Sequence, residues 1–264
     1  MICQSAKPEN LFKNLAPDRH IRLFMDYDGT LADFAPNPDV VVPDDELIHL
    51  LTQLTCHPRL HTAIISGRRL DHIQTLAPIQ GIWLAGTYGL EMQSPDGQKI
   101  HVLDYKKVRP IIMDIKPAWQ QLVSGNREFY LEDKGWSLAL HGNRGSIEEV
   151  KTIFSAAQQL ATQQRTQGIF HFLGGHKFLE VCPKIATKTN ALEFIQKNDP
   201  VSGSLPVYLG DDDKDEIAFS AILKMGGTPI LVAKQERRTQ ACCRLASPQV
   251  TRVWLEELLQ FLSR

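Results

Sequence analysis

The sequence predicts an α/β protein in which a parallel β-sheet forms a core domain and a smaller α+β module is inserted into it. Short apolar runs alternate with segments whose apolar residues recur at helical spacing, which is typical of parallel sheets. Between residues 106 and 182 this order changes, and it resumes afterwards. We therefore expect a core domain over 1–105 and 183–264, and an inserted domain over 106–182.

Five short apolar runs in the core segments predict buried strands, because strands covered on both faces have no polar side. These runs are residues 21–25, 61–65, 81–85, 207–209 and 229–232. Segments with an apolar stripe predict helices at 45–54, 70–76, 189–196, 216–223 and 251–262. Because strand, helix and strand alternate, the elements predict a parallel sheet with right-handed crossovers.

The inserted segment has a different order of elements. The pattern predicts a helix over 108–122, strands over 128–132 and 136–141, a helix over 146–162, and two last strands around Gly174 and Gly175. Ligands of parallel sheets bind beyond the carboxyl ends of the strands. We therefore expect the inserted module to cover that edge of the core.

The composition is that of a folded protein and excludes several classes. Of the 264 residues 43% are hydrophobic, so the chain can bury a large core and is not mainly disordered. With 29 basic and 30 acidic side chains the net charge is -1. No overall field therefore favours a nucleic acid or an anionic membrane as partner.

The cysteines and the ends of the chain predict a location. None of the five cysteines forms a Cys-x-x-Cys pair, so we expect reduced thiols rather than a zinc or redox site. The first ten residues lack the apolar run of a signal peptide, and no later segment offers about 18 consecutive apolar residues. These features predict a cytoplasmic protein.

Asp26 and Asp28 follow the first apolar run and precede Gly29 and Thr30. Two carboxylates so close together repel each other unless a cation or a polar ligand shares their charge. A divalent metal site is the functional interpretation of this pair. The alternative is a pair of turn or helix-capping carboxylates.

Ser66 follows the second apolar run and precedes Gly67 and Arg68. A serine at a helix start, next to a flexible glycine, presents a hydroxyl and main-chain N–H groups to an anion such as phosphate. The alternative is that Ser66 only caps the helix.

The segment from Gly210 to Glu216 carries five acids in the six positions after the glycine. Helix dipoles stabilise such charges by only about 0.3 to 1 kcal/mol each, which does not match this much repulsion. A metal would relieve it. An EF-hand loop would need Gly where Glu216 stands and Glu where Ile222 stands, so Mg²⁺, which needs only a few carboxylates, fits better than Ca²⁺.

Lys188 stands at the start of a predicted helix, where its charge is unfavourable unless an anion compensates it. A solvated surface lysine is the alternative. Taken together, Lys188, Mg²⁺ and Ser66 supply the positive charge and hydrogen bonds that a phosphate ester needs. Two aspartates supply a nucleophile and a proton donor.

These residues resemble the four ordered motifs of the haloacid dehalogenase superfamily, and most closely those of its trehalose-6-phosphate phosphatase family. The motifs are Asp26-x-Asp28-Gly-Thr, Ser66-Gly67-Arg68, Lys188 and Gly-Asp211-Asp212. Further matches are Pro36 and Pro38, Gly86 and Gly89, Glu132, Lys134 and His141, Lys177, Glu180 and Pro183, and Asp215 with Glu216. The resemblance implies a Rossmann-like core with an inserted α+β cap.

The resemblance also implies a role for each residue. Asp26 would be the nucleophile and Asp28 the general acid and later base. Asp26, the main-chain carbonyl of Asp28, and Asp211 would bind Mg²⁺, supported by Asp212 and Asp215. Ser66 with Gly67 and Arg68, together with Lys188, would bind the phosphoryl group, and Glu132, Lys134, His141 and Glu180 would bind sugar hydroxyls. For the last four, an ordinary surface salt-bridge pattern is the alternative.

The implied function is that of a magnesium-dependent hydrolase releasing trehalose and phosphate from trehalose 6-phosphate through an aspartyl-phosphate. Where the family usually has Gly-Glu-His-Gly this chain has Thr87 and Tyr88 between the glycines, Cys182 replaces an arginine, and Thr189 replaces a glycine. The leaving group therefore stays open between trehalose and other glycosyl groups, as in glucosylglycerol phosphate, glucosyl-3-phosphoglycerate or sucrose 6-phosphate. A phosphosugar-binding regulator without catalysis is a further alternative, and a sugar-phosphate synthase is a possible functional partner.

Overall fold

The computed structural model describes residues 11, 15–16, 18–34, 41–163, 168–175 and 177–264. Pro36, Pro38 and Cys3 lie outside these residues. The chain divides into two compact units, one formed by Met1–Ile100 with Thr187–Arg264 and the other by His101–Ala186. The second unit is thus inserted between two segments of the first.

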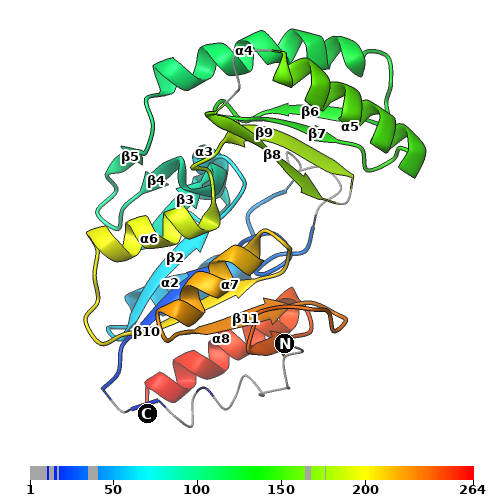
Figure 1. The fold of residues 1–264 in the computed structure, drawn as a ribbon. Coiled ribbons are helices and arrows are strands. Elements are labelled where there is room, and N and C mark those ends of the chain that lie inside the picture. Colours follow the sequence, from blue (N-terminus) through cyan, green and yellow to red (C-terminus); the bar gives the residue numbers. More distant parts are fainter. Residues whose placement is uncertain (1–10, 12–14, 17, 35–40, 164–167, 176) are drawn as a thin grey trace. The chain divides into compact units, whose positions relative to one another are not determined.

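The first unit contains a sheet whose described strands run in the order β12-β11-β10-β1-β2-β3-β4-β5 (Figure 1). Neighbouring strands from β12 to β3 are parallel, and β4 is antiparallel to β3. The strands are β1 Ile21–Met25, β2 Leu60–Ile65, β3 Trp83–Gly86, β4 Glu91–Gln93, β5 Lys99–His101, β10 Leu205–Gly210, β11 Thr228–Val232 and β12 Cys243–Leu245. The predicted α/β fold is confirmed.

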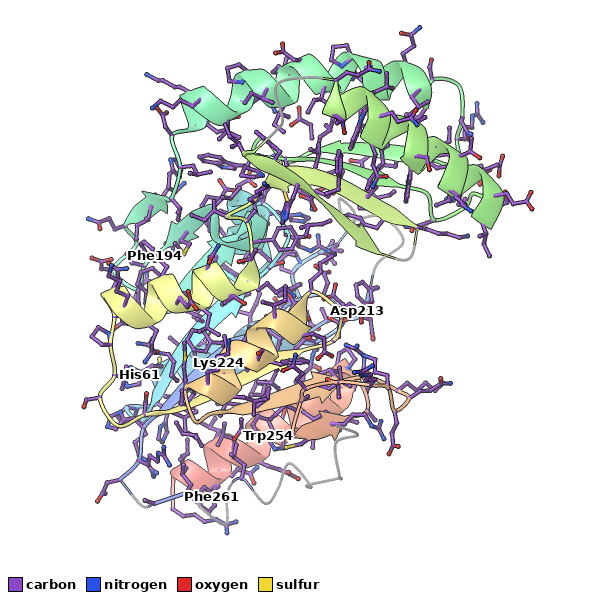
Figure 2. All side chains as sticks on the ribbon, in the orientation of Figure 1. His61, Phe194, Asp213, Lys224, Trp254 and Phe261 are labelled. Atoms are coloured by element: carbon purple, nitrogen blue, oxygen red, sulfur yellow. The ribbon has the colours of Figure 1, made fainter. Side chains whose placement is uncertain are left out.

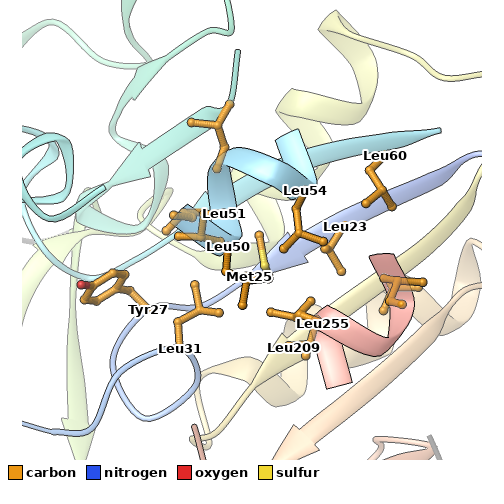
Figure 3. Packing of buried hydrophobic residues seen from close by; sticks show 14 of the residues in the cluster. Leu23, Met25, Tyr27, Leu31, Leu50, Leu51, Leu54, Leu60, Leu209 and Leu255 are labelled. Carbon is orange, nitrogen blue, oxygen red and sulfur yellow. The ribbon is translucent and has the colours of Figure 1, made fainter. Parts of the chain in front are cut away.

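Helices pack on both faces of this sheet. They are α2 Asp45–Cys56, α3 Leu70–Leu76, α6 Lys188–Asn198, α7 Asp215–Lys224 and α8 Pro248–Leu262. On one face Leu23 and Met25 of β1 pack among Leu51 and Leu54 of α2 and Leu255 of α8 (Figure 3). Each Å² of apolar surface buried on this face stabilises the fold by about 25 cal/mol. The apolar residues of each strand therefore stay inside, and the polar residues follow where the strand ends.

The second unit has a four-stranded antiparallel sheet in the order β6-β7-β9-β8 among the described residues. Its strands are β6 Tyr130–Asp133, β7 Leu138–His141, β8 Phe170–Gly175 and β9 Phe178–Pro183, and its helices are α4 Tyr105–Leu122 and α5 Ile147–Thr162. Both helices lie against one face of this sheet (Figure 1). The indole N–H of Trp119 on α4 donates to the carbonyl of Ala157 on α5 at 2.9 Å, which ties the two helices together.

Two predictions about this architecture need correction. Gly174 and Gly175 were expected at a turn, but they are the last residues of β8 and pair with Leu179 and Phe178. Lys177, with φ of 54°, takes the left-handed conformation there instead. The strands β4, β5 and β12 were not predicted, because three residues are too few to show an alternating pattern.

Two further properties of the described residues bear on the predictions. None of their helices combines the length and apolar composition needed to cross a membrane. The four cysteines among them, Cys56, Cys182, Cys242 and Cys243, form no disulfide with one another.

Candidate active site

The carboxyl edge of the first unit's sheet gathers the core motif residues. Asp26 directly follows β1, Ser66 follows β2 and Asp211 follows β10, while Lys188 is the first residue of α6. Because β2, β1 and β10 are adjacent and parallel, their carboxyl ends meet at one edge. All four residues belong to the same unit.

Lys188 lies between two carboxylates. Its Nζ is 2.5 Å from Oδ2 of Asp26 and 2.6 Å from Oδ1 of Asp215, and the side chain is almost fully buried. Burial alone would lower the pKa of Lys188, but Asp215 and Asp26 raise it well above its ordinary value. Lys188 is therefore a buried, charged lysine, and the alternative of a solvated surface lysine is wrong.

Asp215 is held by four hydrogen-bond donors. Its Oδ1 accepts from Lys188 and from the Tyr208 hydroxyl, at 2.6 and 2.7 Å. Its Oδ2 accepts from the main-chain N–H groups of Asp211 and Asp212, at 3.0 and 3.1 Å. Asp215 therefore organises the loop and the lysine around it. Tyr208 was not predicted, because an aromatic residue in a strand carries no signal of a polar role.

The repulsion within the acidic segment is relieved largely by cations of the chain itself. Lys214 pairs with Asp212 at 3.4 Å, and Arg237 lies 2.8 Å from Asp213 and 3.2 Å from Glu216. These ion pairs relieve part of the repulsion, and the predicted metal stays a prediction. In the described part of the chain Asp211 alone among the five acids has no ion pair.

Burial and neighbouring carboxylates favour the neutral forms of Asp211 and Asp26. Burial raises the pKa of Asp211 to about 9, and the negative charges of Asp26 and Asp215 add to this. Burial raises the pKa of Asp26 to about 7, Lys188 opposes this, and Asp215 adds to it. A cation bound between these carboxylates would favour their ionised forms.

The donor set fits a hard divalent cation. Carboxylate oxygens of Asp26, Asp211 and Asp215 lie within 4.8 Å of one another. Those of Asp215 already accept four hydrogen bonds, so Asp26 and Asp211 are the better ligands. Gly29, with φ of 75°, lies next to Asp211. A Cβ on Gly29 would lie only 2.4 Å from the carboxylate of Asp211. The glycine therefore leaves room beside an oxygen-only set of donors, which suits Mg²⁺.

Asp28 binds Arg68 through two hydrogen bonds. Nε and Nη2 of Arg68 each donate at 2.6 Å, one to either carboxylate oxygen, and the Arg68 side chain is 8% exposed. The carboxylate of Asp28 thus lies apart from the cluster of Asp26, Asp211 and Asp215. This bidentate geometry is the strongest that arginine and a carboxylate form.

Ser66 is buried, and its Oγ accepts from the main-chain N–H of Arg68 at 3.1 Å. It does not cap a helix, since α3 begins only at Leu70. The alternative that Ser66 only caps the helix is therefore wrong. The N–H of Leu70 donates instead to Oε1 of Glu91 at 2.8 Å.

A strained segment, in which this chain departs from the family pattern, supports this loop. Thr87 and Tyr88 both have positive φ, 46° and 55°, which costs free energy in non-glycine residues. The N–H of Tyr88 donates to the Ser66 carbonyl at 2.9 Å, and that of Thr87 to the Arg68 carbonyl at 2.6 Å. A Cβ on Gly67 would lie 2.7 Å from the Tyr88 ring, so Gly67 is the residue that allows this packing.

The sugar-binding candidates come together within the second unit. Glu132, Ala139 and Glu180 are register partners across β6, β7 and β9. Lys134 Nζ lies 3.1 Å from Glu180, and Nε2 of His141 lies 2.9 Å from Glu132. Glu180 is fully buried and Lys134 nearly so, so the alternative of a surface salt-bridge pattern is wrong.

Two neighbours of this cluster were missed by the sequence analysis. The hydroxyl of Ser137 donates to Oε1 of Glu180 at 2.5 Å. Nε2 of His171 lies 3.1 Å from the Sγ of Cys182, its register partner in β9. Ser137 precedes β7 and His171 lies in β8, and neither residue type alone indicates a polar partner.

Comparison with known proteins places this arrangement in a family. The family model described as trehalose-phosphatase matches residues 24–249. The chain belongs to the trehalose-phosphatase family. It is 30% identical over 243 residues to the trehalose-6-phosphate phosphatase of Escherichia coli, covering 91% of this chain and 87% of that protein. It is 28% identical over 263 residues to trehalose 6-phosphate phosphatase RA3 of Zea mays, covering 92% and 71%.

Solved structures agree in fold. The C-terminal domain of trehalose-6-phosphate phosphatase from C. albicans superimposes with a TM-score of 0.83 at 18% identity, covering 98% of both chains. As a member of the trehalose-phosphatase family the chain is a phosphoric monoester hydrolase, and the predicted enzyme class is confirmed.

Proposed function

We propose that the protein is a magnesium-dependent phosphatase that hydrolyses trehalose 6-phosphate to trehalose and phosphate. The observation that carries this proposal is the buried lysine Lys188, which Asp26 and Asp215 share, beside the carboxylate of Asp211. This arrangement provides a nucleophile, a fixed positive charge and a cation site within one strand-end cluster. The names of the relatives support trehalose 6-phosphate as the substrate.

Asp26 attacks phosphorus in the proposed first step. A bond forms between a carboxylate oxygen of Asp26 and phosphorus, and the bond between phosphorus and the sugar oxygen breaks. Asp28 donates a proton to the departing sugar oxygen. In the second step Asp28 takes a proton from a water molecule, which attacks the aspartyl-phosphate and releases inorganic phosphate.

Positive charge around the phosphoryl group comes from the chain and from Mg²⁺. Lys188 pairs with the phosphoryl oxygens, and Ser66 and Gly67 donate hydrogen bonds to them. Asp26, the main-chain carbonyl of Asp28, and Asp211 would hold the metal, and Asp212 and Asp215 would support it. When bound, Mg²⁺ supplies further positive charge to the phosphoryl oxygens.

Arg68 links the phosphate-binding loop to Asp28. Its Nε and Nη2 donate to the two carboxylate oxygens of Asp28. In the proposed reaction a phosphoryl group that binds Arg68 draws it away from Asp28, which leaves the Asp28 carboxyl group free to face the departing sugar oxygen. Arg68 is in this way both a phosphate ligand and a partner of the acid.

The sugar is recognised in this proposal by Glu132, Lys134, His141 and Glu180 of the second unit. Buried carboxylates and a lysine that already bind one another offer preorganised acceptors and donors for hydroxyl groups. The substrate itself must come from a glycosyl transfer to a sugar phosphate, so a functional link to a sugar-phosphate synthase is expected. The free cysteines suit the reducing cytoplasm.

Phosphate release from a panel of substrates tests the proposal. The panel contains trehalose 6-phosphate, glucosylglycerol phosphate, glucosyl-3-phosphoglycerate and sucrose 6-phosphate, each with Mg²⁺ and with a chelator. We expect the highest kcat/KM for trehalose 6-phosphate and no turnover with the chelator. A higher kcat/KM for another ester would identify that ester as the substrate. The departure from the family pattern at Thr87 and Tyr88 keeps this outcome open. Binding of trehalose 6-phosphate without phosphate release would indicate a regulator instead.

A further inference from the structure

The loop that follows β11 is fixed at its base. Nη1 of Arg244 donates to the carbonyls of Ala233 and Lys234, at 2.8 and 3.2 Å. The N–H of Ala233 donates to the carbonyl of Leu245 at 2.9 Å. A residue carried by this loop therefore has a defined position relative to the end of the sheet.

Arg237 extends from this loop to the acidic segment. Its Nη2 donates to the main-chain carbonyl of Asp211 at 3.2 Å, and its Nη1 donates to Oδ1 of Asp213 at 2.8 Å. The same Nη1 lies 3.2 Å from Glu216. Asp213 lies near the start of α7, at the opposite end of the helix from Lys224 (Figure 2). One guanidinium thus contacts the segment at three positions.

The main chain on both sides of Asp211 is held by partners. Its N–H donates to Asp215 at 3.0 Å, and its carbonyl accepts from Arg237. Its carboxylate is left facing those of Asp26 and Asp215, within 4.8 Å. Two anchors on the main chain therefore set the direction of a side chain that has no ion pair in the described residues.

We infer that Arg237 is a positioning residue that orients Asp211 for divalent cation binding. This inference rests on the proposed function, because it requires Asp211 to be a metal ligand. Arg237 acts through the carbonyl of Asp211 and through the shape of the loop, and it touches neither substrate nor metal. None of the four core motifs includes it.

The charge of Arg237 and its role in positioning Asp211 have opposite effects on metal affinity. A guanidinium beside a cation site repels the cation, so removal of its charge alone would tighten metal binding. A guanidinium that holds the ligand in place favours the cation, so its removal would weaken metal binding. Lysine keeps the charge but loses the planar fork with which Arg237 reaches three partners at once.

Isothermal titration of the whole protein with Mg²⁺ tests the inference. The variants are Arg237→Gln, Arg237→Lys and Arg238→Gln, the last being a control that removes the same charge from an exposed neighbour. We expect about 10-fold weaker Mg²⁺ binding for both Arg237 variants, as is typical when a partner of a metal ligand is lost. The control should bind Mg²⁺ as the wild type does. Thermal melting without metal verifies that each variant folds.

The outcomes separate this inference from the proposed function. Tighter or unchanged binding by Arg237→Gln, or wild-type binding by Arg237→Lys, would overturn the positioning role and leave the metal site standing. A wild-type protein that takes up no Mg²⁺ would overturn the metal site and, with it, this inference.

Discussion

Nζ of Lys188 lies 2.5 Å from the carboxylate of Asp26, although the two residues are 162 positions apart in the chain. The contact joins the start of α6 to the end of β1 inside the protein. It couples the stability of the fold to the chemistry of the site, because neither charge is favourable there without the other.

Lys188→Met is expected to abolish turnover and to destabilise the protein by about 3 to 5 kcal/mol, since it leaves two buried carboxylates without their cation. Denaturant unfolding and phosphate release measure the two effects. Lys197→Met, at an exposed position of the same helix, is the control. A Lys188 variant as stable as this control would contradict the buried ion pair.

Asp26→Asn is expected to lower kcat below detection while the protein stays folded. The amide cannot act as a nucleophile, yet it matches the carboxyl in size and can still accept from the Tyr27 N–H, which is 2.7 Å from Asp26 Oδ1. Rapid-quench mass spectrometry of the wild type should find a phosphorylated peptide that contains Asp26. Turnover by the asparagine variant would remove Asp26 as the nucleophile.

Asp211→Asn is expected to stabilise the metal-free protein at alkaline pH and to abolish its stabilisation by Mg²⁺. The pKa of Asp211 is about 9 in the folded protein and about 3.9 in the unfolded chain. Between these values the folded state binds a proton that the unfolded state releases, so the free energy of unfolding falls as the pH rises. Melting curves with and without Mg²⁺ should show the variant's advantage growing towards pH 9.

Asp133→Asn is expected to destabilise the second unit by about 1 to 2 kcal/mol at neutral pH. Asp133 accepts from Arg109 at 2.6 Å and from Lys116 at 2.8 Å, which ties β6 to α4. These contacts hold its pKa well below the usual range against the opposing effect of burial. The stabilisation is therefore present above about pH 4 and is lost as the pH falls through the lowered pKa. Urea unfolding at pH 7 and at pH 3 measures the difference, which should shrink at pH 3.

Glu132→Gln is expected to raise KM for trehalose 6-phosphate about 10-fold, because a charged acceptor for a sugar hydroxyl is lost. A small aryl phosphate, which carries no sugar, serves as the control substrate. Its kcat/KM should not change in the same variant. An equal loss with both substrates would assign Glu132 to the stability of the second unit instead.

The sequence predicted the bounds of some elements correctly. The bounds of β1 and α3 agree with the prediction, and in β1 this is because the apolar run ends at Asp26. The proximity of Asp26, Asp211 and Lys188 followed from the rule that parallel strands present their carboxyl ends at one edge. Local pattern and strand direction were sufficient for these features.

Partners that depend on the folded chain could not be predicted. Tyr208 looks like a core residue until Asp215 approaches its hydroxyl, and Arg237 looks like a solvated loop residue 24 positions from Asp213. Ser66 was expected at a helix start because serine caps helices, but Glu91 takes over that function at Leu70. In each case the deciding contact comes from another element.

The central strand of the core acquires its second neighbour late in protein synthesis. Ile21 of β1 pairs with Leu60 on one side and with Leu205 on the other. At the ribosome's rate of about 5 to 20 residues per second, one edge of β1 waits roughly 10 to 40 s for its partner. During that interval the unpaired N–H and C=O groups of this edge can pair with other strands, so exposure to chaperones and to other nascent strands is built into the order of its segments.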